Sequence, residues 1–159
     1  MRKALFFFLT FLFSLTWSAS LHAQCNPGEN QYVIEVTTGS GNFPGEIGWS
    51  IVDASATVID TAAPGTYSGT SVTTDTVCLI DGTAYTFRAY DTYGDGWNGN
   101  TYKVYRLCDN SIVADNGGLT PDNGVNPTPT DLEVAEAFNT LSTACPSCTF
   151  PSSLTATTI

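Results

Sequence analysis

The chain is poor in the residue types on which many enzymes depend. It contains a single histidine, His22, within an N-terminal segment that we expect to be removed. Without this residue, no Ser-His-Asp or Cys-His arrangement and no histidine-ligated metal site is available to the remaining chain. A phosphate-binding loop of Gly, Lys and Ser is also missing. We therefore predict a protein that is not itself an enzyme.

Basic residues are equally scarce. After position 23 the chain has three Lys or Arg residues against all 15 Asp and Glu residues, a net charge of −12. Nucleic acid and anionic membranes bind basic surfaces, so this composition disfavours both as partners. An acidic excess suits divalent cations, and it is equally typical of soluble exported proteins. Charge alone leaves both explanations open.

No apolar run is long enough for a permanent membrane anchor. Arg2 and Lys3 precede the run Ala4–Trp17, which is shorter than the roughly 20 residues that span a bilayer. A basic start, a short apolar run and small residues up to Ala23 predict a secretory signal peptide over residues 1–23. We expect a secreted protein, extracellular or at the cell surface, with no membrane insertion after cleavage.

Helical periodicity is almost absent, whereas the two-residue alternation of half-buried strands recurs along the chain. It marks residues 32–37, 46–53, 57–60, 67–72, 75–80, 85–90, 101–108 and 111–114. Residues 132–141 fit a strand or a short helix, and their alternation favours a strand. We expect a hairpin-type turn at Asp81–Gly82. The sequence therefore predicts an all-β fold, an antiparallel β-sandwich that is jelly-roll-like, over residues 24–144.

Five cysteines in an exported chain indicate disulfide bonds, and the odd number leaves one cysteine without a partner within the chain. We pair Cys78 with Cys108, because both lie in apolar segments typical of strands. Cys25 then pairs with Cys145 or Cys148 across the two ends of the domain. The spacing of Cys145 and Cys148 is that of redox motifs, but their Pro- and Ser-rich surroundings favour a structural role.

The segment Asp91–Asn100 concentrates more functional groups than any other part of the chain. Its oxygen-bearing side chains are Asp91, Asp95, Asn98 and Asn100, and its three glycines permit a sharply folded loop. Calcium takes about six to eight oxygen ligands, so the loop supplies most of a calcium site, which Glu46 or Asp53 would complete. The spacing is not that of an EF-hand. The alternative is a structural turn, in which the Asp and Asn side chains bind their own backbone.

Two aromatic side chains in the same loop point to a second kind of site. Tyr93 and Trp97 offer flat apolar faces beside polar groups, as in carbohydrate-binding platforms. Trp97 fits equally well as an inward-facing core residue, as we expect of Trp49. A glycosidase-type role for Asp91 and Asp95 is disfavoured, because nothing on a solvated loop would separate their pKa values.

The same loop resembles a known kind of module. Residues 85–102 resemble a β-sandwich module of large secreted bacterial proteins with a D-x-Y/F-G-D-G-W-N-G signature. Residues 46–53 are similar to the E-I-S-W-x-L/I segment of that family, with Gly48 in place of its more frequent serine, and Val77-Cys78-Leu79 also fits. The resemblance covers roughly residues 30–140 and implies a binding or adhesion module.

The last residues look like the start of another domain. Residues 145–159 are typical of a linker followed, from Pro151, by the first strand of a truncated fibronectin type III-like module. The resemblance implies the N-terminal part of a larger protein with further domains. Our leading hypothesis is a calcium-stabilised module that binds a glycan or protein at the cell surface. An accessory domain of a secreted hydrolase, such as a peptidase, and a structural spacer without ligand are the alternatives.

Overall fold

The computed structural model describes residues 25–39, 41–116, 120–123, 131–143 and 145. Its elements are β1 (Glu29–Thr38), β2 (Ile47–Asp53), β3 (Val58–Ala62), β4 (Ser71–Ile80), β5 (Ala84–Asp91), β6 (Thr101–Arg106), β7 (Ile112–Asp115) and β8 (Asp131–Asn139). Among these residues there is no helix that is long and apolar enough to cross a membrane. The predicted signal peptide, Cys148 and the predicted fibronectin-like strand lie outside the described residues.

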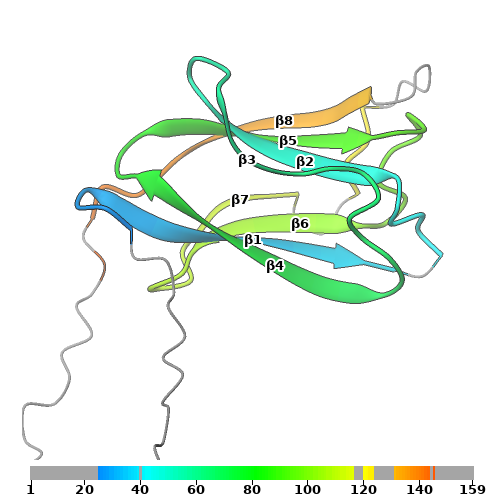
Figure 1. Ribbon diagram of the computed structural model, residues 1–159, viewed down its shortest axis with the longest axis horizontal. Coiled ribbons are helices and arrows are strands. Elements are labelled where there is room, and N and C mark those ends of the chain that lie inside the picture. The colour runs from blue at the N-terminus through cyan, green and yellow to red at the C-terminus, as the bar shows by residue number, and fades with distance from the viewer. Residues whose placement is uncertain (1–24, 40, 117–119, 124–130, 144, 146–159) are drawn as a thin grey trace, which may run out of the picture.

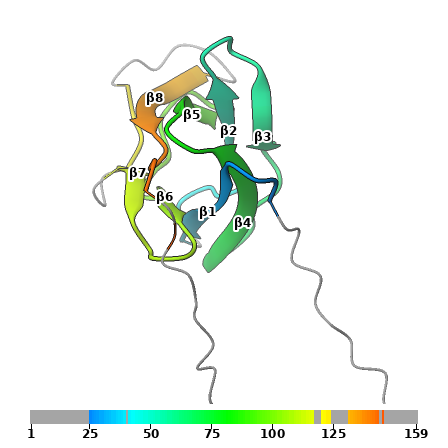
Figure 2. The same ribbon diagram turned by 90° about the vertical axis from the view of Figure 1, so that its left-hand side faces the viewer.

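The eight strands form two antiparallel sheets that face each other. One sheet has the order β4-β1-β6-β7 and the other has the order β3-β2-β5-β8. Figure 1 shows the two layers from the side, and Figure 2 shows them from the end at which β1 begins and β8 ends. The predicted all-β antiparallel sandwich is therefore confirmed, and so is the strand interpretation of the segment that became β8.

The core lies between the layers and consists of the alternate residues that the sequence pattern marks. The fully or nearly fully buried side chains include Tyr32, Ile34 and Val36 of β1, Ile47, Trp49 and Ile51 of β2, and Tyr85, Phe87 and Ala89 of β5. Phe87 occupies the middle, with its ring centroid 5.9 Å from that of Trp49 and 4.0 Å from that of Tyr102. Stacked aromatic rings of this kind add to the free energy that burial already contributes.

Strand β4 corrects two expectations. Residues 67–72 and 75–80 were predicted as separate strands, but a single strand begins at Ser71. Tyr67 lies before it as the buried residue of an otherwise exposed loop; its hydroxyl accepts a 2.6 Å hydrogen bond from Nε1 of Trp49, and Gly69 has a φ of 65°. Asp81–Gly82 is not a hairpin turn, because β4 and β5 belong to different sheets and the chain crosses between them here.

Gly48 lies where the structure leaves no room for a side chain. A Cβ atom at this position would lie 2.8 Å from Cδ of Pro64 and 2.9 Å from the carbonyl oxygen of Ala62. Both neighbours belong to the end of β3 and the segment that follows it. The close approach of this backbone to β2 therefore requires glycine.

The two ends of the sandwich differ in what they carry. We call the end at which β1 begins and β8 ends the disulfide end, and the opposite end, which holds the β1–β2 and β5–β6 connections, the loop end (Figure 1). At the loop end both connections cross from one sheet to the other. The loops there therefore arch over the open edge of the core.

Four cysteines form two disulfides at the disulfide end, but not in the predicted pairs. The bonds join Cys25 with Cys78 and Cys108 with Cys145, over Cα–Cα distances of 5.5 and 5.9 Å. The pairing of Cys78 with Cys108 was wrong because β1 lies between β4 and β6. Strands two places apart are about 9–10 Å from each other, which is too far for a disulfide. Two disulfides are typical of extracellular proteins.

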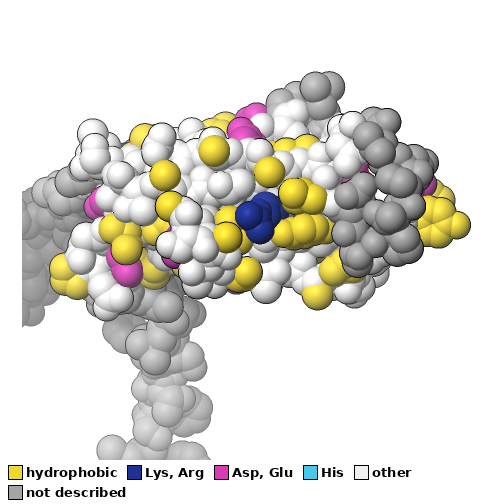
Figure 3. Space-filling model, turned by 90° about the horizontal axis from the view of Figure 1, so that it is seen from above, with side chains coloured by type: hydrophobic (Ala, Val, Ile, Leu, Met, Phe, Trp, Pro, Cys, Tyr) yellow, Lys and Arg dark blue, Asp and Glu magenta, His cyan; other side chains and the backbone are white. Residues whose placement is uncertain are grey.

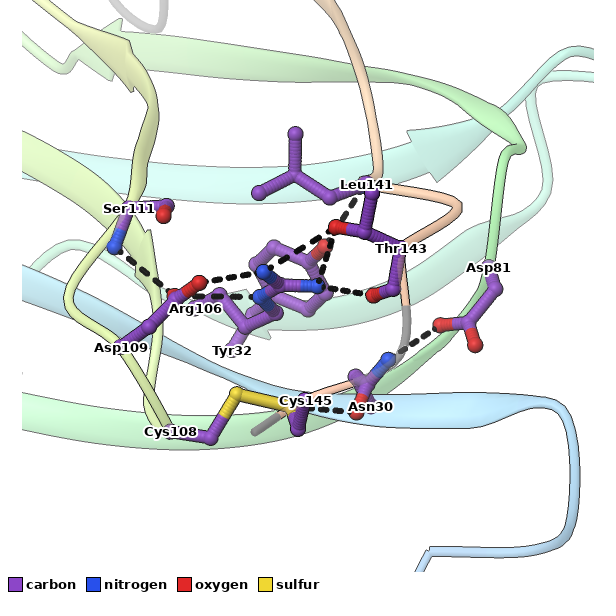
Figure 4. Close-up of a disulfide and its surroundings, with 10 residues drawn as sticks. All are labelled: Asn30, Tyr32, Asp81, Arg106, Cys108, Asp109, Ser111, Leu141, Thr143 and Cys145. Carbon is purple, nitrogen blue, oxygen red and sulfur yellow. Dashed lines mark hydrogen bonds and ion pairs between the residues drawn. A yellow bond between two sulfur atoms is a disulfide. The ribbon is translucent and has the colours of Figure 1, made fainter. Parts of the chain in front are cut away.

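Arg106 secures the same end with hydrogen bonds, as Figure 4 shows. Its side chain is only 3% exposed, and it donates to the backbone oxygen of Thr143 at 2.6 Å and to Oδ1 of Asp109 at 3.1 Å. The hydrogen bonds from Arg106 hold the pKa of Asp109 well below its usual value. The buried guanidinium thus has a carboxylate partner, and the segment after β8 is fixed to the β6–β7 turn.

Candidate functional site

The predicted loop is an arch between the two sheets, from the end of β5 to the start of β6. Gly94, Gly96 and Gly99 have φ angles of 76°, 84° and 96°, and Asn98 has a φ of 51°. These angles lie in the left-handed region that glycine enters without strain and that asparagine tolerates. The expectation that the three glycines permit a sharply folded loop is confirmed.

Trp97 points inward and closes the core beneath the arch. Its side chain is fully buried, with its ring edge-on to Tyr102 at a centroid distance of 5.9 Å. Its indole Nε1–H donates to the backbone oxygen of Tyr90 at 2.8 Å. The prediction of Trp97 as a ligand-binding surface was therefore wrong, because no face of the indole is available to a ligand. Tyr93, the other predicted aromatic, is 70% exposed.

Asn100 ties the arch to the neighbouring β1–β2 loop. Its side chain is fully buried; Oδ1 accepts a 3.1 Å hydrogen bond from the backbone of Gly39, and Nδ2 donates to the backbone oxygen of Asn42 at 2.6 Å. Both polar groups of the amide are thus used inside the protein. Asn100 leaves the predicted set of calcium ligands for this reason and acts as a structural connection between two loops.

Three carboxylates meet where the two loops lie side by side. Glu46, Asp91 and Asp95 each offer one carboxylate oxygen, and these oxygens all lie within 4.8 Å of one another. The pairing of β2 with β5 sets Ile47 opposite Asp91, and the backbone N–H of Thr92 donates to the backbone oxygen of Glu46 at 3.0 Å. Glu46 and Asp91 are thereby held together although 45 residues separate them in the chain.

Two other predicted ligands have different positions. Asp53 lies at the far end of β2, where its Oδ1 accepts hydrogen bonds from the backbone of Ser55 and Thr57, both at 2.8 Å. It caps a turn and cannot complete the cluster. Asn98 lies within the arch, where its Nδ2 donates to Oδ1 of Asp95 at 2.9 Å and thereby orients that carboxylate.

Asp91 is the most informative member of the cluster. Its side chain is fully buried, and its Oδ2 accepts a 2.9 Å hydrogen bond from the backbone N–H of Asp95. Its Oδ1 is also buried, and no group among the described residues donates a hydrogen bond to it. A buried acceptor without a donor costs about 1–3 kcal/mol, and more when it is charged. A bound cation would remove this cost.

No basic side chain of the described residues neutralises the cluster. Lys103 pairs with Glu35 at 2.9 Å, and Arg106 pairs with Asp109 at the opposite end. Arg88 lies in β5 and is the only Lys or Arg in the strands of its sheet. Figure 3 shows the outer face of that sheet, which carries one basic patch among hydrophobic side chains. The described part of the chain therefore supplies no ion pair that compensates the negative charges at the loop end.

The charges within the cluster affect one another. Burial raises the pKa of Glu46, and the neighbouring charges of Asp91 and Asp95 raise it further. Two carboxylate charges 4.8 Å apart repel by about 3 kcal/mol at an effective dielectric constant of about 20. Solvent screening reduces this value at the exposed groups. The arrangement is therefore costly to the protein by itself and favourable to a divalent cation.

Sequence reasoning missed Phe43, which lies beside the cluster. It is 58% exposed and has a φ of 47°, which is unusual for a bulky residue. Together with Glu46, Tyr93 and Asp95 it lines an open pocket of about 290 Å³. The sequence offered one signal for Phe43: it is the single aromatic residue of a loop otherwise made of Gly, Ser, Asn and Pro. An aromatic side chain in such a loop has no core position to fill.

Fold and site together define a two-sheet β-sandwich with three converging carboxylates at one end. Comparisons of this chain with protein-family models, with curated protein sequences and with solved structures gave no match. The resemblance of residues 85–102 to secreted bacterial modules therefore stays a prediction. What the site does has to be argued from its own side chains.

Proposed function

We propose that this protein is a secreted or cell-surface, non-catalytic β-sandwich module that binds calcium at its loop end and uses that end for adhesion. The observation that carries the proposal is the buried Oδ1 of Asp91, which lacks a donor among the described residues and belongs to a cluster of three carboxylates. Calcium prefers carboxylate oxygens and accepts irregular geometry, so it fits a site built from two loops.

The position of the site supports a role in binding. The first and last described residues, Cys25 and Cys145, both lie in disulfides at the opposite end. Loops that a rigid sandwich positions are where binding residues concentrate in such folds. An ion between the β1–β2 and β5–β6 loops would fix both loops and thereby the surface that they present.

The first test is thermal unfolding of the disulfide-bonded protein in calcium and in EDTA. At calcium concentrations about 100-fold above Kd, a bound ion stabilises the folded state by about 2.7 kcal/mol, which would raise Tm by about 10 °C. Asp91→Asn should abolish this rise. In EDTA the variant should unfold at or above the Tm of the wild type, because one charge of the cluster is gone.

Asp60→Asn is the matched control. Asp60 lies in β3 and, like Asp91, accepts a hydrogen bond from a following backbone N–H, that of Thr61 at 2.8 Å, but it does not belong to the cluster. This variant should keep the full calcium-dependent rise. A wild-type Tm that is the same in calcium and in EDTA, or a rise that survives Asp91→Asn, would refute the proposed ion site.

A further inference from the structure

The three carboxylates do not enclose their centre on all sides. Glu46 and Asp95 line the open pocket of about 290 Å³, whereas Asp91 is fully buried. The cluster therefore has a buried side, formed by Asp91, and an accessible side that faces the pocket. A cation held by all three carboxylates would lie at the floor of this pocket, within reach of a molecule that enters it.

The free oxygens of the cluster are too few to complete the shell of calcium. Of the six carboxylate oxygens, Oδ2 of Asp91 and Oδ1 of Asp95 accept hydrogen bonds from the protein. The other four include the buried Oδ1 of Asp91. Calcium takes about six to eight oxygen ligands, so positions remain for oxygens from outside. The accessible side of the cluster places these positions in the pocket.

Two aromatic side chains stand at the same pocket. Tyr93 is 70% exposed and Phe43 is 58% exposed, so neither ring has been used to build the core. The left-handed backbone of Phe43 adds strain that the fold does not need for packing, and such strain concentrates at functional positions. The lining thus combines carboxylates, which surround a cation, with flat apolar surfaces.

This combination fits one class of ligand. We propose, building on the calcium site proposed above, that the pocket binds a neutral hexose glycan. Two adjacent hydroxyl groups of the sugar complete the calcium shell and donate hydrogen bonds to Glu46 and Asp95, while the apolar face of the sugar ring packs on Tyr93 and Phe43. No Lys or Arg is among the described residues that line the pocket, which disfavours an anionic ligand. Aromatic faces beside oriented polar groups are suited to a sugar.

The test is isothermal titration calorimetry of the disulfide-bonded protein with mannohexaose and with galactohexaose. We expect at least one of the two to bind in calcium and neither to bind in EDTA. Tyr93→Ala should weaken binding at least about fivefold, because the stacking contact is lost. Tyr105→Ala is the matched control, since Tyr105 is a half-exposed tyrosine of β6 that lies on a different pocket. It should bind like the wild type.

A parallel calcium titration separates the two proposals. If calcium binds but neither hexasaccharide does, the glycan inference is overturned and the ion site stands. If calcium fails to bind, both proposals are overturned together. Binding that persists in EDTA, or that Tyr93→Ala leaves unchanged, would also overturn the inference, because each result would place the sugar elsewhere.

Discussion

The two ends of this sandwich hold buried charge in opposite ways. At the disulfide end, the buried guanidinium of Arg106 donates to the carboxylate of Asp109 and to Thr143, and two disulfides fix the chain nearby. At the loop end, the buried carboxylate of Asp91 has carboxylate neighbours and an oxygen to which no described group donates. The first arrangement is complete without a ligand. The second becomes favourable when a cation binds.

The largest expected effect comes from removing a disulfide. Replacing both Cys108 and Cys145 with serine should lower the free energy of unfolding by about 4 kcal/mol, because the unfolded chain regains the freedom of a closed loop of 37 residues. Urea unfolding measures the change. Calcium should shift the midpoint of the variant as far as that of the wild type. A lost calcium shift would show that the two ends are coupled.

A smaller loss is expected from Trp97→Phe. The shorter ring leaves a cavity under the arch and removes the donor to the backbone oxygen of Tyr90, which together should cost about 2–3 kcal/mol. Urea unfolding in EDTA isolates this packing contribution from any effect of the ion. A cost below about 0.5 kcal/mol would contradict the inward position of the indole.

Asn100→Ala separates a connecting residue from a ligand. The change leaves the backbone groups of Gly39 and Asn42 without their side-chain partner, at an expected cost of about 2 kcal/mol. Because Asn100 does not ligate the ion in our account, calcium should still raise the Tm of the variant, with a weaker apparent affinity. Complete loss of the calcium response, with the fold intact by circular dichroism, would return Asn100 to the ligand set.

The smallest effect is expected at Asp109 and depends on pH. Hydrogen bonds from Arg106 lower the pKa of Asp109 in the folded state below its ordinary value of 3.8. The ionised carboxylate therefore contributes stability that is fully present above about pH 4 and is lost as the pH falls further. Asp109→Asn should be less stable than the wild type at pH 7, with the difference shrinking in acid. A difference that is constant down to pH 2 would contradict this linkage.

The strands were more predictable than their connections. Segments such as 32–37 and 85–90 alternate because successive side chains of a strand point to opposite faces of the sheet. A few neighbouring residues are therefore enough to reveal the pattern. The error at residues 67–72 concerns where β4 begins, and the error at Asp81–Gly82 concerns which sheet the next strand joins. That choice depends on partners far along the chain, so a local pattern carries little information about it. The disulfide pairing failed for the same reason, since β1 separates β4 from β6.

The site divides along the same line. The sequence indicated Asp91, Asp95 and Glu46 as candidate ligands because carboxylates near a Gly-rich loop suit calcium, and the structure brings these three together. It left Trp97 open between a ligand-binding surface and a core position, and it assigned Asn100 to the calcium ligands; the structure buries both. Both residues lie in an arch between two sheets, and a local motif does not reveal that the core lies directly beneath it.

Local sequence patterns are enough to predict the class of fold and the chemical groups at the loop end, because alternating apolar residues form sheets and Asp, Glu and Gly form an oxygen-rich loop. Which of these groups meet depends on how the two sheets pack. The pairing of β2 with β5 sets Glu46 beside Asp91, and the arch turns Trp97 inward while Tyr93 stays outside. Convergence of this kind depends on distances between residues far apart in the chain, which only the packed sandwich establishes.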